Sequence, residues 1–225
     1  MNKLVFKLFY PNLVYILVLA LLSGCSQITG KAFDVPHETA KSPEVYFCPE
    51  TDCSKAFENK IKVANFSVHC AFYDLDLKNI INSLARKSKT AEVKLVIDGS
   101  NYKGQIKGDG VRTDDGMQLM HNKFCIIDKS IVLTGSFNPT DNDNNYNDNN
   151  VIAIHSGWLA QNYEEEFDEL WNREFGKGNK VKNPVVNVNN INIQNYFCPE
   201  DDCASHIVNE IKNAEGSVKA AFFTF

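Results

Sequence analysis

The chain has 225 residues, of which 44% are hydrophobic and 23% are charged, so its composition is that of a globular protein and excludes a disordered chain. Its length fits one domain, or one domain and part of a second. The formal net charge of −5 disfavours sequence-independent binding of nucleic acid through a broad basic surface, although a local basic groove remains compatible with it.

Residues 1–24 have the layout of a secretory signal peptide. Two lysines precede an unbroken apolar run, Leu13–Leu22, which is too short to span a bilayer as a helix. The sequence Leu-Ser-Gly-Cys then ends at Cys25 and resembles the lipobox of prokaryotic lipoproteins, in which the cysteine is lipidated. We therefore expect an exported protein, anchored on the outer face of the cytoplasmic membrane or in the periplasm. Plain secretion with an incidental Cys25 is the alternative. Residues 25–44, polar and with two prolines, are expected to form a tether.

Four of the cysteines form two C-x4-C pairs, which are Cys48 with Cys53 and Cys198 with Cys203. Because disulfides persist in the oxidising compartment of an exported protein, each pair is expected to form a local disulfide. A shared four-cysteine zinc site is the alternative, but its spacing would differ from that of the common zinc fingers. Cys70 and Cys125 lie in apolar strand patterns, where packing in the core is the default for a cysteine.

Residues 45–97 alternate between strand and helix patterns. The expected elements are a strand at Val45–Phe47, a helix at Cys53–Ala64 capped by Asp52, a strand at Phe66–Tyr73, a helix at Leu77–Arg86 and a strand at Glu92–Ile97. This order predicts an α/β fold with a mixed, parallel-rich sheet flanked by helices on both faces. The following stretch, Asp98–Gln118, is rich in Gly, Asp and Lys and is expected to be a loop.

Residues 121–138 have the pattern of a β-hairpin. Two apolar, β-branched runs, Phe124–Ile127 and Ile131–Leu133, are separated by Asp128, Lys129 and Ser130. With a two-residue loop at Lys129 and Ser130, residues whose numbers sum to 259 would face each other.

This pairing would bring four polar side chains together on one face of the hairpin. His121 would face Asn138 and Lys123 would face Ser136, and side chains two residues apart share a face. The cluster suits a phosphate group, because lysine supplies a positive charge, serine and asparagine supply neutral donors, and histidine can attack phosphorus or move a proton. Asp128 would lie on the opposite face, about 16 Å from Lys123 at roughly 3.3 Å per residue, and is expected to fix the turn.

The motif formed by these residues, His121-x-Lys123-x4-Asp128-x6-Gly135-Ser136-x-Asn138, resembles the HKD signature of the phospholipase D superfamily. Agreement at six fixed positions would arise by chance on the order of 10⁻⁸ per start site.

The resemblance implies a phospholipase D-like fold, a phosphodiester substrate, and no cofactor or metal. The residues that it implies as catalytic are His121, Lys123 and Asp128, and those that it implies for binding the substrate phosphate are Ser136, Asn138 and Asn150.

The chain departs from the family pattern after the hairpin. The superfamily commonly has Asn-x-Glu-Asn there, whereas residues 147–150 are Asn-Asp-Asn-Asn. In the family the acidic residue orients the catalytic histidine, and Asn149 occupies that position here. Asp148 could replace it only if the backbone bulges. The following residues predict a strand at Val151–Ile154 and an amphipathic helix at Gly157–Phe175.

An internal repeat follows the helix. Tyr196–Glu200 repeats Tyr46–Glu50 at an offset of 150, and further matches continue to Phe222. We therefore expect a phospholipase D-like domain at residues 45–175, a linker at 176–192, and the first β-α-β of a second repeat at 193–225. Members with two motifs bring both histidines to one interface, where one attacks phosphorus and the other protonates the leaving oxygen. The chain resembles a truncated member of that class, so a homodimer or a missing C-terminal half would supply the second histidine.

The sequence thus predicts an exported, membrane-anchored phosphodiesterase that hydrolyses P–O bonds through a phosphohistidine at His121. Its substrate would be a phospholipid or DNA/RNA. The Phe-Asn-Pro-Thr ending of the hairpin resembles the nuclease-like branch, whereas the lipid anchor and the acidic charge favour lipid. The alternative is a non-catalytic binding module, because the missing half would remove the proton-donating histidine.

Overall fold

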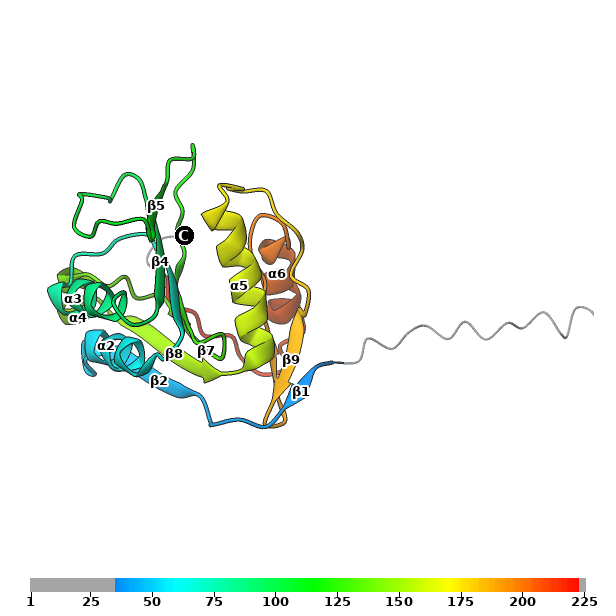
Figure 1. Ribbon diagram of the computed structural model, residues 1–225. Coiled ribbons are helices and arrows are strands. Elements are labelled where there is room, and N and C mark those ends of the chain that lie inside the picture. Colours follow the sequence, from blue (N-terminus) through cyan, green and yellow to red (C-terminus); the bar gives the residue numbers. More distant parts are fainter. Residues whose placement is uncertain (1–34, 223–225) are drawn as a thin grey trace, which may run out of the picture. The chain divides into compact units, whose positions relative to one another are not determined.

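A seven-stranded mixed sheet forms the core of the computed structural model, which describes residues 35–222 (Figure 1). In spatial order its strands are β2 (Glu44–Cys48), β8 (Asn149–His155), β7 (Ile131–Gly135), β6 (Lys123–Ile127), β3 (Ser67–Phe72), β4 (Glu92–Asp98) and β5 (Val111–Asp114). Strands β3, β4 and β5 run parallel, and the other neighbours pair antiparallel. The expected α/β fold with a mixed sheet flanked by helices is therefore confirmed, but the sheet is not parallel-rich as expected, because only the β3–β4 and β4–β5 pairs are parallel.

Helices cover both faces of this sheet (Figure 1). On one face lie α2 (Cys53–Val63) and α3 (Lys78–Lys87), and on the other lies α5 (Gly157–Trp171). The short α4 (Asp141–Asn145) and α6 (Cys203–Lys212) are the further helices of the described residues, and α6 buries none of its residues. Helices α2 and α3 bury Phe57 and Leu84 on one face, and α5 buries Phe167 on the other. Asp52 caps α2 as expected, since its carboxylate accepts a hydrogen bond of 3.0 Å from the Lys55 amide. With apolar side chains covered on both faces, the hydrophobic effect is the main force that stabilises the sheet.

Strands also occur where the sequence predicted connections. The expectation of a loop over Asp98–Gln118 is wrong for the residues of β5. This strand pairs with β4, so backbone N–H and C=O groups of β4 that would otherwise lie unpaired at the edge of the sheet are hydrogen-bonded. A four-residue edge strand, Val-Arg-Thr-Asp, is too short for its alternation to be recognised. The segments 25–44 and 176–192 contribute to a second, three-stranded sheet of β1 (His37–Glu38), β9 (Val185–Val188) and β10 (Ile191–Gln194).

The hairpin β6–β7 forms as expected, but its register differs by one residue. Ile127 pairs with Ile131, so partner numbers sum to 258, and the turn holds three residues. Asp128 and Lys129 have positive φ angles of 50° and 51° and leave the strand pairing. The expected cross-strand pairs of His121 with Asn138 and of Lys123 with Ser136 are therefore wrong.

Three disulfides cross-link residues 35–222, the part of the chain that the structure describes. Cys48–Cys53 and Cys198–Cys203 form as expected. Cys70 and Cys125, for which only core packing was expected, are fully buried but also bonded to each other. The cause is the register of β3 with β6, which places these two cysteines directly opposite each other with their Cα atoms 4.1 Å apart.

The second repeat is only partly formed. Helix α6 lies 150 residues after α2, but residues 217–222, which match β3, form no strand in the described part of the chain. In the first copy β3 is held between β4 and β6. Of the expected β-α-β unit, the described residues therefore contain the helix but neither strand, because residues 195–197, which match the strand before α2, also form none and β10 ends at Gln194. The expected signal peptide and Cys25 lie outside the described residues. Within residues 35–222, no helix combines the length and the apolar character that crossing a membrane requires.

Candidate active site

His121, Lys123 and Tyr73 lie together where β6 begins and β3 ends. The Tyr73 amide donates to the carbonyl oxygen of Asn122 at 2.9 Å, which continues the β3–β6 pairing past the last paired residues. The rings of Tyr73 and His121 have their centroids 4.7 Å apart, and the Lys123 Nζ lies 5.2 Å from the Tyr73 centroid. The same Nζ donates to the carbonyl oxygen of His121 at 3.0 Å. An imidazole and an ammonium group are thereby held side by side, with His121 exposed to solvent.

The surroundings lower the pKa of both His121 and Lys123. Partial burial and the nearby Lys123 ammonium lower the pKa of His121, and the Asp98 carboxylate offsets part of this effect. A neutral imidazole nitrogen, which a nucleophile requires, is therefore favoured. Burial lowers the pKa of Lys123 to about 8, against the opposing effect of Asp143, so the amine is still mostly protonated at pH 7.

The hydroxyl and amide side chains of the motif form two separate pairs. Asn150 donates to the Ser136 Oγ from its amide at 3.1 Å and from its side-chain Nδ2 at 3.3 Å. Asn138 donates to the Asp143 Oδ2 from its amide at 2.8 Å and from its Nδ2 at 2.9 Å. Gly135 leaves room for this packing, because a Cβ there would lie 2.2 Å from the Asn150 carbonyl oxygen. Ser136 and Asn138 are thus each held by a neighbouring side chain, and the Asp143 carboxylate that accepts from Asn138 also opposes the fall in the pKa of Lys123.

Asp128 lies at the opposite end of β6 from Lys123. Its carboxylate accepts hydrogen bonds from the backbone amides of Asn65, Phe66 and Ser67 at 2.8, 2.7 and 2.9 Å. These bonds lower the pKa of Asp128 against the opposing effect of desolvation. The carboxylate thus fixes the hairpin turn to the start of β3.

Two carboxylates near the motif were not predicted from the sequence. Asp98, at the end of β4, is only 3% exposed and accepts a 2.9 Å hydrogen bond from the amide of Met120, the residue before His121. Asp143 is 8% exposed and holds Asn138. By contrast, Asn149 pairs with Cys48 at the edge of the sheet. The sequence signal for Asp98 was its place at the carboxyl end of a buried parallel strand, where functional side chains gather in α/β sheets.

A cavity of about 610 Å³ opens beside His121. It lies between residues 114–122, helix α5 and residues 196–200. Its lining contains no lysine or arginine but five carboxylate side chains, which are Asp114, Glu166, Glu169, Glu174 and Glu200. Apolar and aromatic side chains, including Met117, Phe175 and Phe197, complete the lining. Within residues 35–222, no group of three or more His, Cys, Asp or Glu side chains is arranged to hold a metal ion.

The part of the chain that carries the motif is similar to known proteins. Residues 57–171 match the family described as cardiolipin synthase, PLD-like domain. A phospholipase D of Rickettsia typhi is 31% identical over 144 residues, which cover 59% of this chain and 70% of the relative. A phospholipase D of Rickettsia conorii is 30% identical over 165 residues, which cover 69% of this chain and 80% of the relative. A mitochondrial cardiolipin hydrolase of Xenopus tropicalis is 36% identical over 64 residues, or 28% of this chain and 30% of the relative.

Solved structures agree with these matches. Nuc of Salmonella typhimurium, a phospholipase D family member, has a TM-score of 0.53 and 26% identity, and the match covers 59% of this chain and 95% of Nuc. NucT from Helicobacter pylori shares the fold with a TM-score of 0.52 at 17% identity, over 59% of this chain and 96% of NucT. The family match over residues 57–171, the Rickettsia relatives and the likeness to Nuc lead to one conclusion: the chain belongs to the phospholipase D superfamily.

Proposed function

We propose that the chain is a phosphodiesterase that hydrolyses P–O bonds with His121 as nucleophile. Membership of the phospholipase D superfamily supports a hydrolase of this kind. The observation that carries the proposal is the pairing of His121 with Lys123, whose Nζ is hydrogen-bonded to the His121 carbonyl oxygen. The His121 nucleophile and the Lys123 cation can then contact the same phosphodiester group.

In the proposed reaction a neutral nitrogen of His121 attacks phosphorus, the bond between phosphorus and the leaving oxygen breaks, and a phosphohistidine forms. Water then attacks the phosphohistidine and releases the phosphomonoester and free His121. The Lys123 ammonium stabilises the negative charge on the non-bridging oxygens, which is greatest in the transition state. Ser136, Asn138 and Asn150 are proposed to bind the phosphate with neutral donors, and Asp128 to support the hairpin that presents the motif.

We propose a phospholipid as the substrate. The cavity beside His121 is lined by five carboxylates and by apolar side chains. Such a lining repels the repeated phosphates of a nucleic acid strand and accepts neutral or apolar groups. The names of the Rickettsia relatives, phospholipase D, and of the Xenopus relative, cardiolipin hydrolase, point in the same direction.

We further propose that the protein is exported and anchored to a membrane through a lipid on Cys25. The apolar run and the lipobox-like sequence before Cys25 support this, and three disulfides in the structure fit an oxidising compartment. A Cys25→Ser variant should be released from membranes, because each buried CH₂ of an acyl chain contributes about 0.8 kcal/mol to anchoring. Retention of the processed variant in the membrane fraction would contradict the assignment.

The proposed activity is tested by incubating the full chain, in detergent micelles, with phosphatidylcholine and separately with single-stranded DNA. We expect hydrolysis of the lipid, complete loss in His121→Ala, and little change in His37→Ala, a matched control at an exposed histidine on β1. Cleavage of DNA alone would assign a nuclease. Absence of any turnover would favour a non-catalytic binding module.

A further inference from the structure

A nearly buried carboxylate, Asp143, lies beside Asn138, one of the proposed phosphate-binding residues. Asp143 belongs to the short helix α4 and is 8% exposed. Its backbone amide donates to the Oγ of Thr140, the residue that caps this helix, at 3.2 Å. A carboxylate this deeply buried needs hydrogen-bond donors around it, and the side chains that donate to Asp143 are those of Asn138 and Asn147.

Asp143 fixes the orientation of the Asn138 side chain. Its Oδ2 accepts hydrogen bonds from the backbone amide of Asn138 at 2.8 Å and from the Nδ2 at 2.9 Å. The Oδ1 of Asn138 is buried and has no hydrogen-bond partner within the described residues, so Asp143 decides which way this side chain points. An ionised carboxylate only accepts hydrogen bonds. The NH2 group of Asn138 therefore turns toward it, and one of its two hydrogens stays available for a phosphate oxygen.

Asp143 also acts on the charge of Lys123. The Nζ of Lys123 donates to the carbonyl oxygen of His121 and lies 5.2 Å from the centroid of the Tyr73 ring. A carbonyl group and an aromatic ring carry no formal charge, so neither is a countercharge for the ammonium. Burial lowers the pKa of Lys123 to about 8, and the Asp143 carboxylate opposes this fall. A charge on Asp143 thus favours the form of Lys123 that attracts a phosphate.

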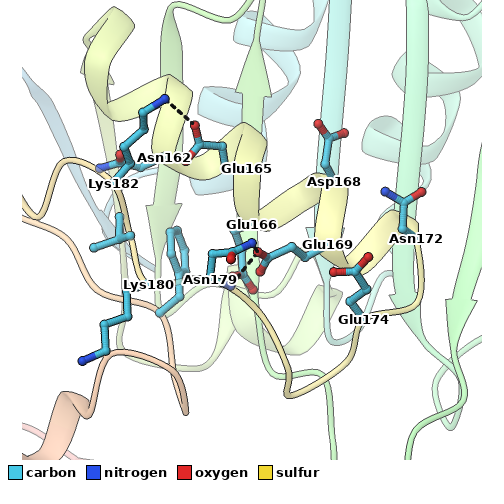
Figure 2. Close-up of a pocket in the computed structure, with 12 residues that line it drawn as sticks. Asn162, Glu165, Glu166, Asp168, Glu169, Asn172, Glu174, Asn179, Lys180 and Lys182 are labelled. Carbon is cyan, nitrogen blue, oxygen red and sulfur yellow. Dashed lines mark hydrogen bonds and ion pairs between the residues drawn. The ribbon is translucent and has the colours of Figure 1, made fainter.

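The carboxylates of α5 lie on the other face of the sheet. Lys123 shares its face of β6 with Cys125, which packs in the core with α2 and α3, whereas α5 covers the opposite face. Figure 2 shows several acidic side chains of α5, among which Glu165 pairs with Lys182 at 3.7 Å. These groups do not replace Asp143 as the countercharge of Lys123.

Three further carboxylates surround Asp143. Asp141, on the same helix, is exposed and accepts a hydrogen bond of 2.8 Å from the side chain of Asn145. Asp74 and Asp76 follow β3, and Asp76 accepts from the backbone amide of Asp141 at 2.7 Å. Burial raises the pKa of Asp74, and Asp76 and Asp143 add to the rise. In the described part of the chain, none of these three carboxylates accepts a hydrogen bond from a side chain of the motif.

We propose that Asp143 is a positioning residue for the substrate phosphate, one carboxylate that both orients the Asn138 amide and supplies the countercharge of Lys123. Both of its oxygens are occupied, Oδ2 by Asn138 and Oδ1 by the Nδ2 of Asn147 at 2.8 Å. Asp143 therefore acts through the groups that it holds and not by contact with the substrate. This role rests on the proposed function and assigns to it a residue that sets the affinity for the phosphate.

Two variants separate the two effects. Asp143→Asn removes the charge but keeps an oxygen that can accept from Asn138, and its NH2 group can donate to Asn147 once that side-chain amide turns. Asp143→Ala removes the acceptor as well. Asp141→Asn is the matched control, because it removes one carboxylate charge from an exposed position of the same helix.

Each full-length variant is measured in two ways. Carbon-13 NMR of labelled lysine side chains follows the titration of Lys123, whose signal is identified by its absence from Lys123→Arg. Steady-state kinetics with phosphatidylcholine in micelles give KM and kcat between pH 6 and pH 9.5. The NMR measurement needs no turnover, so it reports on Asp143 whether or not the chain hydrolyses the lipid.

We expect the titration midpoint of Lys123 to move to lower pH in Asp143→Asn, because loss of a nearby negative charge disfavours the ammonium. The rise of KM with pH should begin at a correspondingly lower pH, while KM and kcat at pH 6 stay close to those of wild type. Asp143→Ala should also raise KM at pH 6 by roughly 3–10-fold, the effect of losing one hydrogen bond to the phosphate, with kcat within about two-fold. Asp141→Asn should match wild type throughout.

An unchanged midpoint of Lys123 in Asp143→Asn would overturn the role as countercharge, and a wild-type KM at pH 6 in Asp143→Ala would overturn the orientation of Asn138. A loss of kcat and stability at constant KM would give Asp143 a structural role only. If Asp143→Ala does not fold, the midpoint in Asp143→Asn decides. A wild-type chain that hydrolyses no lipid would contradict the proposed function, whereas a displaced midpoint of Lys123 would still support the action of Asp143.

Discussion

The Nζ of Lys123 donates a hydrogen bond of 3.0 Å to the carbonyl oxygen of His121, so the two residues of the motif hold each other in place. The side chain of Lys123 reaches back past its neighbour Asn122 and lies beside the ring of Tyr73. The cation is therefore close to the imidazole before any substrate arrives. A substrate phosphate that binds to the ammonium is brought to the nucleophile at the same time.

Binding of substrate should weaken above pH 8. Burial lowers the pKa of Lys123 to about 8, so the ammonium is present below that pH and lost above it. We expect KM to rise as the pH passes 8 in wild type. In Lys123→Arg this rise should disappear, because a guanidinium stays charged throughout the range. Steady-state kinetics between pH 6 and pH 9.5 measure the effect, and a KM of wild type that is independent of pH would contradict it.

Replacing Asp98 with asparagine should lower the pKa of His121. The carboxylate favours the charged imidazolium, and asparagine can still accept the hydrogen bond from the Met120 amide while it removes the charge. We therefore expect the acidic limb of the profile of kcat/KM against pH to move to lower pH. Asp109→Asn, at an exposed position of the loop that follows β4, is the control and should leave the limb in place. An unchanged limb in Asp98→Asn would mean that this carboxylate has no electrostatic effect on the histidine.

Removing the Asp128 carboxylate should affect stability more than catalysis. Three backbone amides, from Asn65 to Ser67, would lose their acceptor in Asp128→Ala. We expect the free energy of unfolding to fall by about 1–3 kcal/mol at pH 7, with kcat within a few-fold of wild type at a temperature where both are folded. Because the hydrogen bonds lower the pKa of Asp128, the wild-type advantage should disappear as the pH falls through that lowered pKa. A large loss of kcat with unchanged stability would assign Asp128 to the chemistry.

The Cys70–Cys125 disulfide should stabilise the fold more than either C-x4-C pair. It joins residues 55 apart in sequence, whereas Cys48 and Cys53 are five apart. Loop-closure entropy gives about 4 kcal/mol for the long loop and about 2 kcal/mol for the short one at 25 °C. Denaturant unfolding of the two double alanine variants measures the difference. A Cys70→Ala/Cys125→Ala variant as stable as the Cys48→Ala/Cys53→Ala variant would contradict it.

The fold and the motif could be predicted from local patterns, but their exact pairing could not. Alternating apolar residues identified β6 and β7, and the spacing of His121 and Lys123 identified the motif. The one-residue register error arose because Asp128 is bonded to Asn65, Phe66 and Ser67, more than 60 residues earlier. No pattern within the hairpin contains that contact.

Contacts between distant segments account for the remaining differences. Cys70 and Cys125 meet only because β3 and β6 are neighbours in the sheet. Glu166 lies in a run of three glutamates on α5, and a helical pattern cannot show that its carboxylate accepts a hydrogen bond from Asn122. The acidic residue expected at position 149 has no counterpart there, and Asp98, on another strand, is the carboxylate that acts on His121.

Trapping the covalent intermediate shows whether His121 attacks phosphorus. The full chain is mixed with phosphatidylcholine, quenched within the first turnover under alkaline conditions that preserve phosphohistidine, and digested for tandem mass spectrometry. We expect a phosphatidyl adduct on His121 that appears before steady state, decays as substrate is exhausted, and is absent from His121→Ala. Turnover of the lipid by wild type without any adduct on His121, or with the adduct on another residue, would contradict it.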